Sequence, residues 1–131
     1  MFAQLSLVNI IDLKQHEKVN SIHLRFLQKQ IKQDGELHVP IIVDMHSMVV
    51  LDGHHRLNSC INMGFRKIPC LLVDYFGDKK IKVLSRRKRF EISKGAVVAA
   101  GLTGALFPNK TTRHYIPYKL QKLSIPLTNL Q

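Results

Sequence analysis

Hydrophobic and polar positions in the first forty residues follow two different periods. Residues 5–8 alternate between apolar and polar side chains, which predicts a first strand. Residues 12–17 are polar and indicate a loop. Asn20 is a candidate N-cap, and apolar residues recur at helical spacing over residues 24–31 until Asp34 and Gly35. This part of the sequence therefore predicts a strand followed by an amphipathic helix that ends at glycine.

Short β-branched or alternating runs follow, separated by turn residues and by two apolar helical runs. They predict strands over residues 41–43, 48–51, 68–75 and 80–84, helices over residues 56–63 and 94–106, and extended pieces at 115–117 and 124–127. Strands and helices alternate without an internal repeat. The sequence thus predicts one compact α/β (mixed α+β) domain over residues 1–131, a small mixed sheet with flanking helices.

The junction between the strand ending at Leu51 and the next helix carries the candidate chemistry. Asp52-Gly53 forms the turn, and His54-His55-Arg56 opens the helix. Such a junction directs backbone N–H groups and the positive end of the helix dipole to one point, which favours a phosphate. The arginine adds a guanidinium fork, the histidines can donate hydrogen bonds or protons, and the aspartate can bind a metal ion. An ordinary Asp-Gly turn with solvated histidines is the alternative interpretation.

Composition narrows the class of protein. The chain has 131 residues, of which 45% are hydrophobic and 22% charged, so a globular domain with a modest core is expected. The first residues lack the pattern of a signal peptide, and the longest apolar run, residues 95–107, is too short to cross a bilayer. We therefore expect a soluble, cytoplasmic protein with no membrane partner. Cys60 and Cys70 fall at apolar positions and are expected to be buried thiols.

Positive charge is concentrated in the C-terminal part. Residues 1–78 hold eight Lys/Arg and eight Asp/Glu, whereas residues 79–131 hold twelve Lys/Arg against Glu91 alone. This asymmetry suggests a polyanionic partner such as a nucleotide, a nucleic acid or an anionic membrane surface. The run Arg86 to Arg89 is either a solvated face or a nucleic-acid contact.

Several segments resemble the ParB/sulfiredoxin superfamily: residues 39–44, 51–57, Gly64 and 68–75. Within it, Asp-Gly-His-His-Arg at 52–56 resembles the branch of free L-serine kinases, which phosphorylate serine to O-phospho-L-serine with ATP or ADP. Residues 16–19 and 106–114 are similar to that branch as well. Sulfiredoxins need a reactive cysteine in the central turn, where this chain has His54, so sulfiredoxin chemistry is disfavoured.

The resemblance implies a role for each candidate residue. From its position alone Glu17 reads as a solvated loop charge, but the matching glutamate of the kinases is the catalytic base. A Mg²⁺ ion could use Asp52 together with the nucleotide, because Mg²⁺ prefers carboxylate and phosphate oxygens. The implied roles are catalysis by Glu17, Asp52 and His55, phosphate binding by Gly53, His54, His55 and Arg56, and serine binding by Lys110, Thr112, Arg113 and His114, so that residues 79–131 complete the site.

An alternative function belongs to a different class. ParB proteins bind DNA and use the related turn for CTP, so the chain could be a nucleotide-binding, DNA-associated regulator without kinase activity, contacting DNA through Arg86 to Arg89. No helix-turn-helix pattern follows residue 75, which disfavours specific DNA reading. The remaining histidines lack the spacing of metal ligands, so no zinc is expected. The sequence leaves the oligomeric state open, and it does not choose between ATP and ADP.

Overall fold

The computed structural model describes residues 3–118, 120 and 122–131. In chain order the strands and helices are β1 (Ala3–Asn9), a 3₁₀ turn (Ile10–Asp12), α1 (Ser21–Asp34), β2 (Glu36–Leu37), β3 (Ile41–Asp44), β4 (Val50–Asp52), α2 (His54–Asn62), β5 (Lys67–Val73), β6 (Lys82–Ser85), α3 (Lys94–Thr103), β7 (Thr112–Tyr115), β8 (Ile125–Pro126) and a second 3₁₀ turn (Leu127–Leu130).

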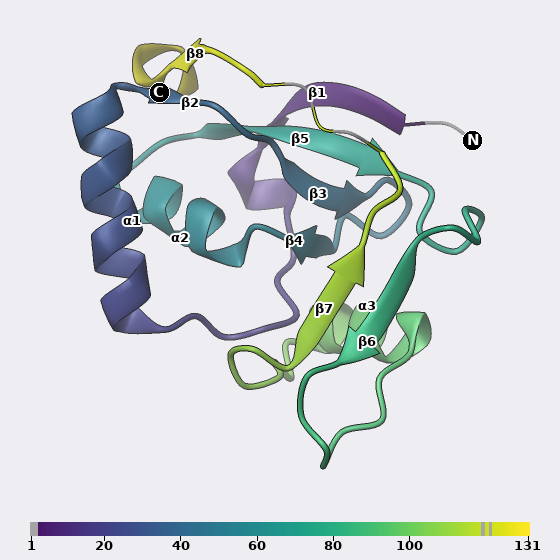
Figure 1. Ribbon diagram of the computed structural model, residues 1–131. Helices are drawn as coiled ribbons and strands as arrows, with labels where there is room; N and C mark the ends of the chain where they lie inside the picture. Colours follow the sequence, from purple (N-terminus) through teal and green to yellow (C-terminus); the bar gives the residue numbers. More distant parts are fainter. Residues whose placement is uncertain (1–2, 119, 121) are drawn as a thin grey trace.

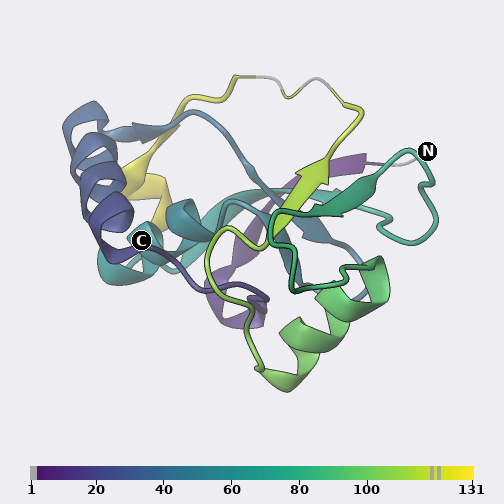
Figure 2. The same cartoon turned by 60° about the horizontal axis from the view of Figure 1, so that its bottom comes forward.

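The central sheet has the strand order β1-β5-β3-β4. Strand β5 pairs antiparallel with β1 and parallel with β3, and β4 pairs antiparallel with β3. Figure 1 shows α1 and α2 together on one side of the central sheet and α3 beside the separate two-stranded sheet of β6 and β7. Turning the molecule brings α3 and this two-stranded sheet forward (Figure 2). The fold class predicted from the pattern is confirmed.

Both faces of the sheet are covered, and the strand sequences show why. Successive side chains of a strand point to opposite faces. Ile41 packs in a core cluster with residues of α1 and α2 such as Ile31 and Leu57, whereas the next residue, Ile42, packs in a second cluster with Val97 of α3. A strand buried on both faces is expected to be continuously apolar rather than alternating, as residues 41–43 are.

The ends of α1 match the prediction. The Asn20 side chain accepts hydrogen bonds from the backbone N–H groups of Ile22 and His23, both at 3.0 Å. Gly35 ends the helix with a φ of 70°, in the left-handed region. The polar segment that carries Glu17 therefore leads directly into a helix whose start is fixed by the Asn20 cap.

The strands predicted over residues 48–51, 68–75 and 80–84 instead span Val50–Asp52, Lys67–Val73 and Lys82–Ser85. Two predicted helix boundaries are also wrong, and glycine is the reason in both cases. Helix α2 begins at His54 rather than at Arg56, because Gly53 turns the chain at once with a φ of 101°. A Cβ atom at Gly53 would lie 2.4 Å from Cγ2 of Ile41, so the close packing also requires glycine. Helix α3 ends at Thr103 rather than near residue 106, because Gly104 adopts a φ of 77°.

Cys60 and Cys70 are free and buried, as expected. Burial raises the pKa of each thiol to about 12, so neither is a reactive thiolate at neutral pH. In the described part of the chain, no helix is both long and apolar enough to cross a membrane.

Candidate active site

A cavity of about 510 Å³ lies where the start of α2 faces β7 and the segment that precedes α1. Its lining includes all ten candidate residues: Glu17, Asp52, Gly53, His54, His55, Arg56, Lys110, Thr112, Arg113 and His114. His23, Leu27, Leu51 and Arg86 also line it, and the sequence analysis assigned none of these four to the site. The tertiary structure thus brings three segments that are far apart in the sequence to one cavity.

Glu17 is held firmly at one carboxylate oxygen. Its Oε1 accepts hydrogen bonds from the backbone N–H groups of Thr111 at 3.1 Å and Thr112 at 2.8 Å, and from the Thr112 hydroxyl at 2.9 Å. The backbones on either side are joined as well, because Lys18 N–H donates to the Phe107 carbonyl and Phe107 N–H donates to the His16 carbonyl. Among the hydrogen bonds of the described residues, none reaches Oε2, which leaves that oxygen available in the cavity.

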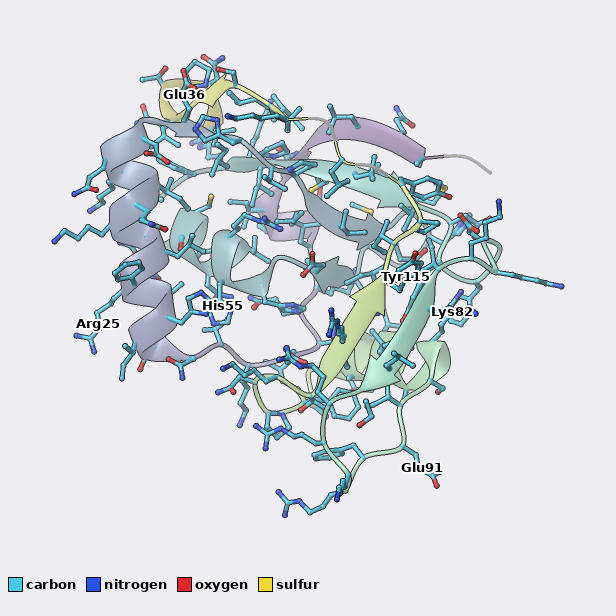
Figure 3. All side chains as sticks on the ribbon, viewed as in Figure 1. Arg25, Glu36, His55, Lys82, Glu91 and Tyr115 are labelled. Atoms are coloured by element: carbon cyan, nitrogen blue, oxygen red, sulfur yellow. The ribbon has the colours of Figure 1, made fainter. Side chains whose placement is uncertain are left out.

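The two histidines of the turn hold the segment that carries Glu17. The Nε2 atom of His54 accepts from the backbone N–H of His16 at 3.2 Å, and the Nε2 atom of His55 accepts from that of Asn20 at 3.0 Å. Figure 3 shows His55 between α2 and the start of α1. Burial lowers the pKa of both histidines, as expected for rings that accept hydrogen bonds. Each neutral ring therefore carries its proton on Nδ1.

His114 and Thr112 have partners within the protein. Nε2 of His114 lies 2.8 Å from the Tyr75 hydroxyl. Burial lowers the pKa of His114 to about 3. The Thr112 hydroxyl contacts Glu17 and His16. By contrast, Lys110 and Arg113 are exposed at the cavity edge and can reach a ligand.

Arg56 has unused capacity as a donor. Its Nε is buried without a hydrogen-bond partner among the described residues, and its Nη2 lies 3.9 Å from Oδ2 of Asp52, too far for a hydrogen bond. Burial lowers the pKa of the guanidinium, and the neighbouring Asp52 opposes that shift. Because Arg56 lines the cavity and carries a positive charge, this corner of the cavity favours an anion.

A magnesium ion bound together with a nucleotide fits the residues present. Within the described ranges, no three His, Cys, Asp or Glu side chains converge on one point. Mg²⁺ commonly binds through one or two carboxylates plus phosphate oxygens, and keeps several waters. The Asp52 side chain is 62% exposed in the cavity lining, and so can supply such a carboxylate.

No family model matches the chain. Over 81 residues it is 35% identical to a protein named ATP-dependent L-serine kinase from Desulfurococcus mucosus, a match that covers 58% of this chain and 32% of that protein. Over 72 residues it is 39% identical to a ParB-like protein from Sulfolobus acidocaldarius, covering 55% and 36%. The chain spans about a third of the length of these curated relatives.

Similarity to a solved structure covers much more of the chain. A free serine kinase in complex with AMP superposes with a TM-score of 0.87, over 97% of this chain and 93% of that chain, at 15% identity. The chain has the fold of free serine kinase. At this identity the structural similarity shows the fold alone. Together with the curated matches, it confirms the resemblance to the ParB/sulfiredoxin superfamily and its serine kinase branch.

Proposed function

We propose that the chain is a nucleotide-dependent kinase that transfers a phosphoryl group from ATP or ADP to the hydroxyl of free L-serine, giving O-phospho-L-serine. The observation that carries this proposal is the position of Glu17. Its carboxylate is held at one oxygen and lines the same cavity as the start of α2 and the Arg56 side chain. The names of the curated relatives add support.

In this proposal each part of the cavity has one task. Gly53, the first N–H groups of α2 and Arg56 bind the nucleotide phosphates, while His54 and His55 hold the Glu17 segment and can donate from Nδ1. Asp52 would hold Mg²⁺, which neutralises phosphate charge when bound. Oε2 of Glu17 accepts the serine hydroxyl proton as the new O–P bond forms and the nucleotide leaves.

Binding of the amino acid is assigned to the basic C-terminal part. Lys110 and Arg113 can pair with the serine carboxylate. Thr112 and His114 support the site indirectly, because Thr112 is bonded to Glu17 and His114 to Tyr75. Residues 79–131 thus complete a site begun by residues 1–78, and we propose that residues 1–131 act as one domain. Because ATP and ADP are abundant in the cytoplasm, we also propose that the protein works there.

Phosphorus NMR tests the reaction directly. The protein is mixed with Mg²⁺, L-serine and, in separate tubes, ATP and ADP. A phosphoserine signal that Glu17→Gln removes is expected, and the productive tube identifies the donor. Glu91→Gln is the matched control, because Glu91 is exposed on the loop after β6 (Figure 3) and is not among the residues that line the cavity. No phosphoserine in either tube, with nucleotide bound, would contradict the proposal.

A DNA-associated regulator is the second candidate. Arg86, Lys88 and Arg89 are exposed, and one curated relative is named a ParB-like protein. Arg87 instead donates to the Asn109 carbonyl through Nη2 at 2.7 Å. Duplex binding through this run should weaken steeply as salt rises and disappear when Lys88 and Arg89 are both replaced by alanine. Serine kinase activity should be unaffected by this double replacement, so the two functions can be separated.

A further inference from the structure

A line of hydrogen-bond contacts runs from the sheet to Glu17 through a fully buried histidine. Nδ1 of His16 lies 2.7 Å from the Val50 carbonyl oxygen of β4, and Nε2 lies 2.9 Å from Oγ1 of Thr112. That hydroxyl oxygen lies 2.9 Å from Oε1 of Glu17. His16 is 0% exposed, so water does not replace the two contacts of its ring.

This line has three contacts but only two hydrogens that can fill them. The Val50 carbonyl can only accept, so Nδ1 of His16 carries a hydrogen. Burial lowers the pKa of His16, with the Val50 contact and Glu17 opposing the shift, so the ring is neutral and Nε2 has a free lone pair. The Thr112 hydroxyl has a single hydrogen. It can donate either to Nε2 of His16 or to Oε1 of Glu17, but not to both.

We propose that His16 is a positioning residue that acts on Glu17 through the Thr112 hydroxyl, by offering that hydroxyl a second acceptor. With Glu17 ionised, the hydroxyl donates to Oε1, the stronger acceptor because it is charged. Once Glu17 has been protonated, the hydroxyl turns and donates to Nε2 of His16. His16 thereby stabilises the protonated form of Glu17, the form that proton transfer produces. This inference rests on the proposed function, in which Glu17 is the base.

The step balances without a charge on His16. The proton of the serine hydroxyl moves to Oε2 of Glu17 while the serine oxygen forms its bond to phosphorus and the phosphorus–oxygen bond to the nucleotide breaks. The hydrogen of Thr112 stays on Thr112 and changes only its acceptor. The two backbone N–H groups of Thr111 and Thr112 stay bonded to Oε1 throughout and keep the carboxyl group in place.

A double-mutant cycle on turnover tests the coupling. His16→Phe keeps a ring of similar volume and removes the acceptor, and should lower kcat about tenfold, equivalent to one hydrogen bond, with the KM for nucleotide unchanged. His16→Gln keeps an acceptor near the position of Nε2 and should restore most of the turnover. In a Thr112→Val background, His16→Phe should have almost no further effect. In a Thr112→Ser background, which keeps the hydroxyl, the tenfold loss should return.

The outcomes separate this inference from the proposed function. A wild-type protein that forms no phosphoserine refutes the function. An active wild-type protein in which the effects of His16→Phe and Thr112→Val simply multiply refutes the inference, because the coupling then does not pass through the hydroxyl.

Nitrogen NMR of the histidine rings gives a readout that depends neither on activity nor on the folding of His16→Phe. The His16 signals are assigned by their loss in His16→Gln. We expect a neutral ring with its proton on Nδ1. A proton on Nε2 at neutral pH would overturn the inference, since Nε2 could then accept nothing from Thr112.

Discussion

Replacing Glu17 by glutamine and by alanine separates its two roles, as an anchor of the loop and as a base. The carboxylate oxygen Oε1 accepts from the backbone N–H groups of Thr111 and Thr112, two residues that are 0% and 9% exposed. Glutamine supplies an amide oxygen at the same place and can accept the same hydrogen bonds. Alanine leaves both buried N–H groups without an acceptor.

The magnitudes follow from this count. An unsatisfied buried donor costs about 1–3 kcal/mol, so the loss of the acceptor for two donors in Glu17→Ala should lower the free energy of unfolding by about 2–6 kcal/mol. That is a large part of the roughly 5–15 kcal/mol that stabilises a typical domain. Glu17→Gln should cost less than about 1 kcal/mol. Both variants lose the general base, which typically contributes about 10²–10⁴-fold to turnover.

Urea unfolding followed by circular dichroism, together with phosphoserine formation followed by phosphorus NMR, measures both quantities on the same protein samples. Equal stability of Glu17→Ala and Glu17→Gln would show that the carboxylate does not anchor the loop. Turnover of Glu17→Gln within about tenfold of the wild type would remove Glu17 as the base, since an amide cannot take up the proton.

Three further predictions concern Arg56, Gly53 and His114. Arg56→Ala should weaken nucleotide binding about 10–100-fold by calorimetry, since charge-assisted hydrogen bonds are lost, whereas the exposed Arg66→Ala should not; equal affinities would contradict this. Gly53→Ala should lower the urea midpoint, because φ is 101° and the new Cβ would meet Ile41; an unchanged midpoint would refute it. The pKa of His114 is lowered to about 3 in the folded state, so the unfolded chain binds more protons between that pH and about 6.5, and stability falls as pH drops through this window. His114→Gln should reduce the slope of the unfolding free energy against pH in this window by about one proton. A slope equal to that of the wild type would exclude the effect.

Local patterns predicted the helix starts and stops well where a single side chain sets them. The Asn20 cap and the Gly35 stop of α1 depend on neighbours within a few residues, and both are where the pattern puts them. The start of α2 was predicted two residues late, because the sequence alone does not show that Gly53 packs against Ile41 of the adjacent strand. The contact that makes glycine necessary comes from tertiary packing.

The sequence by itself determined the fold class and the strand–glycine–helix arrangement of the turn at residues 52–56. Both follow from short-range chemistry, namely an apolar strand, a glycine, and a helix start with an arginine. Only the tertiary structure decided what the side chains bind. Glu17 and Thr112 are 95 residues apart in the sequence, yet they share a hydrogen bond. His16 was not among the predicted site residues, because a buried ring is distinguished from a solvated one only by the distant carbonyl and hydroxyl that it meets. Hydrogen-bond partners of this kind are set by the packing of the whole chain, and spacing along the sequence does not encode them.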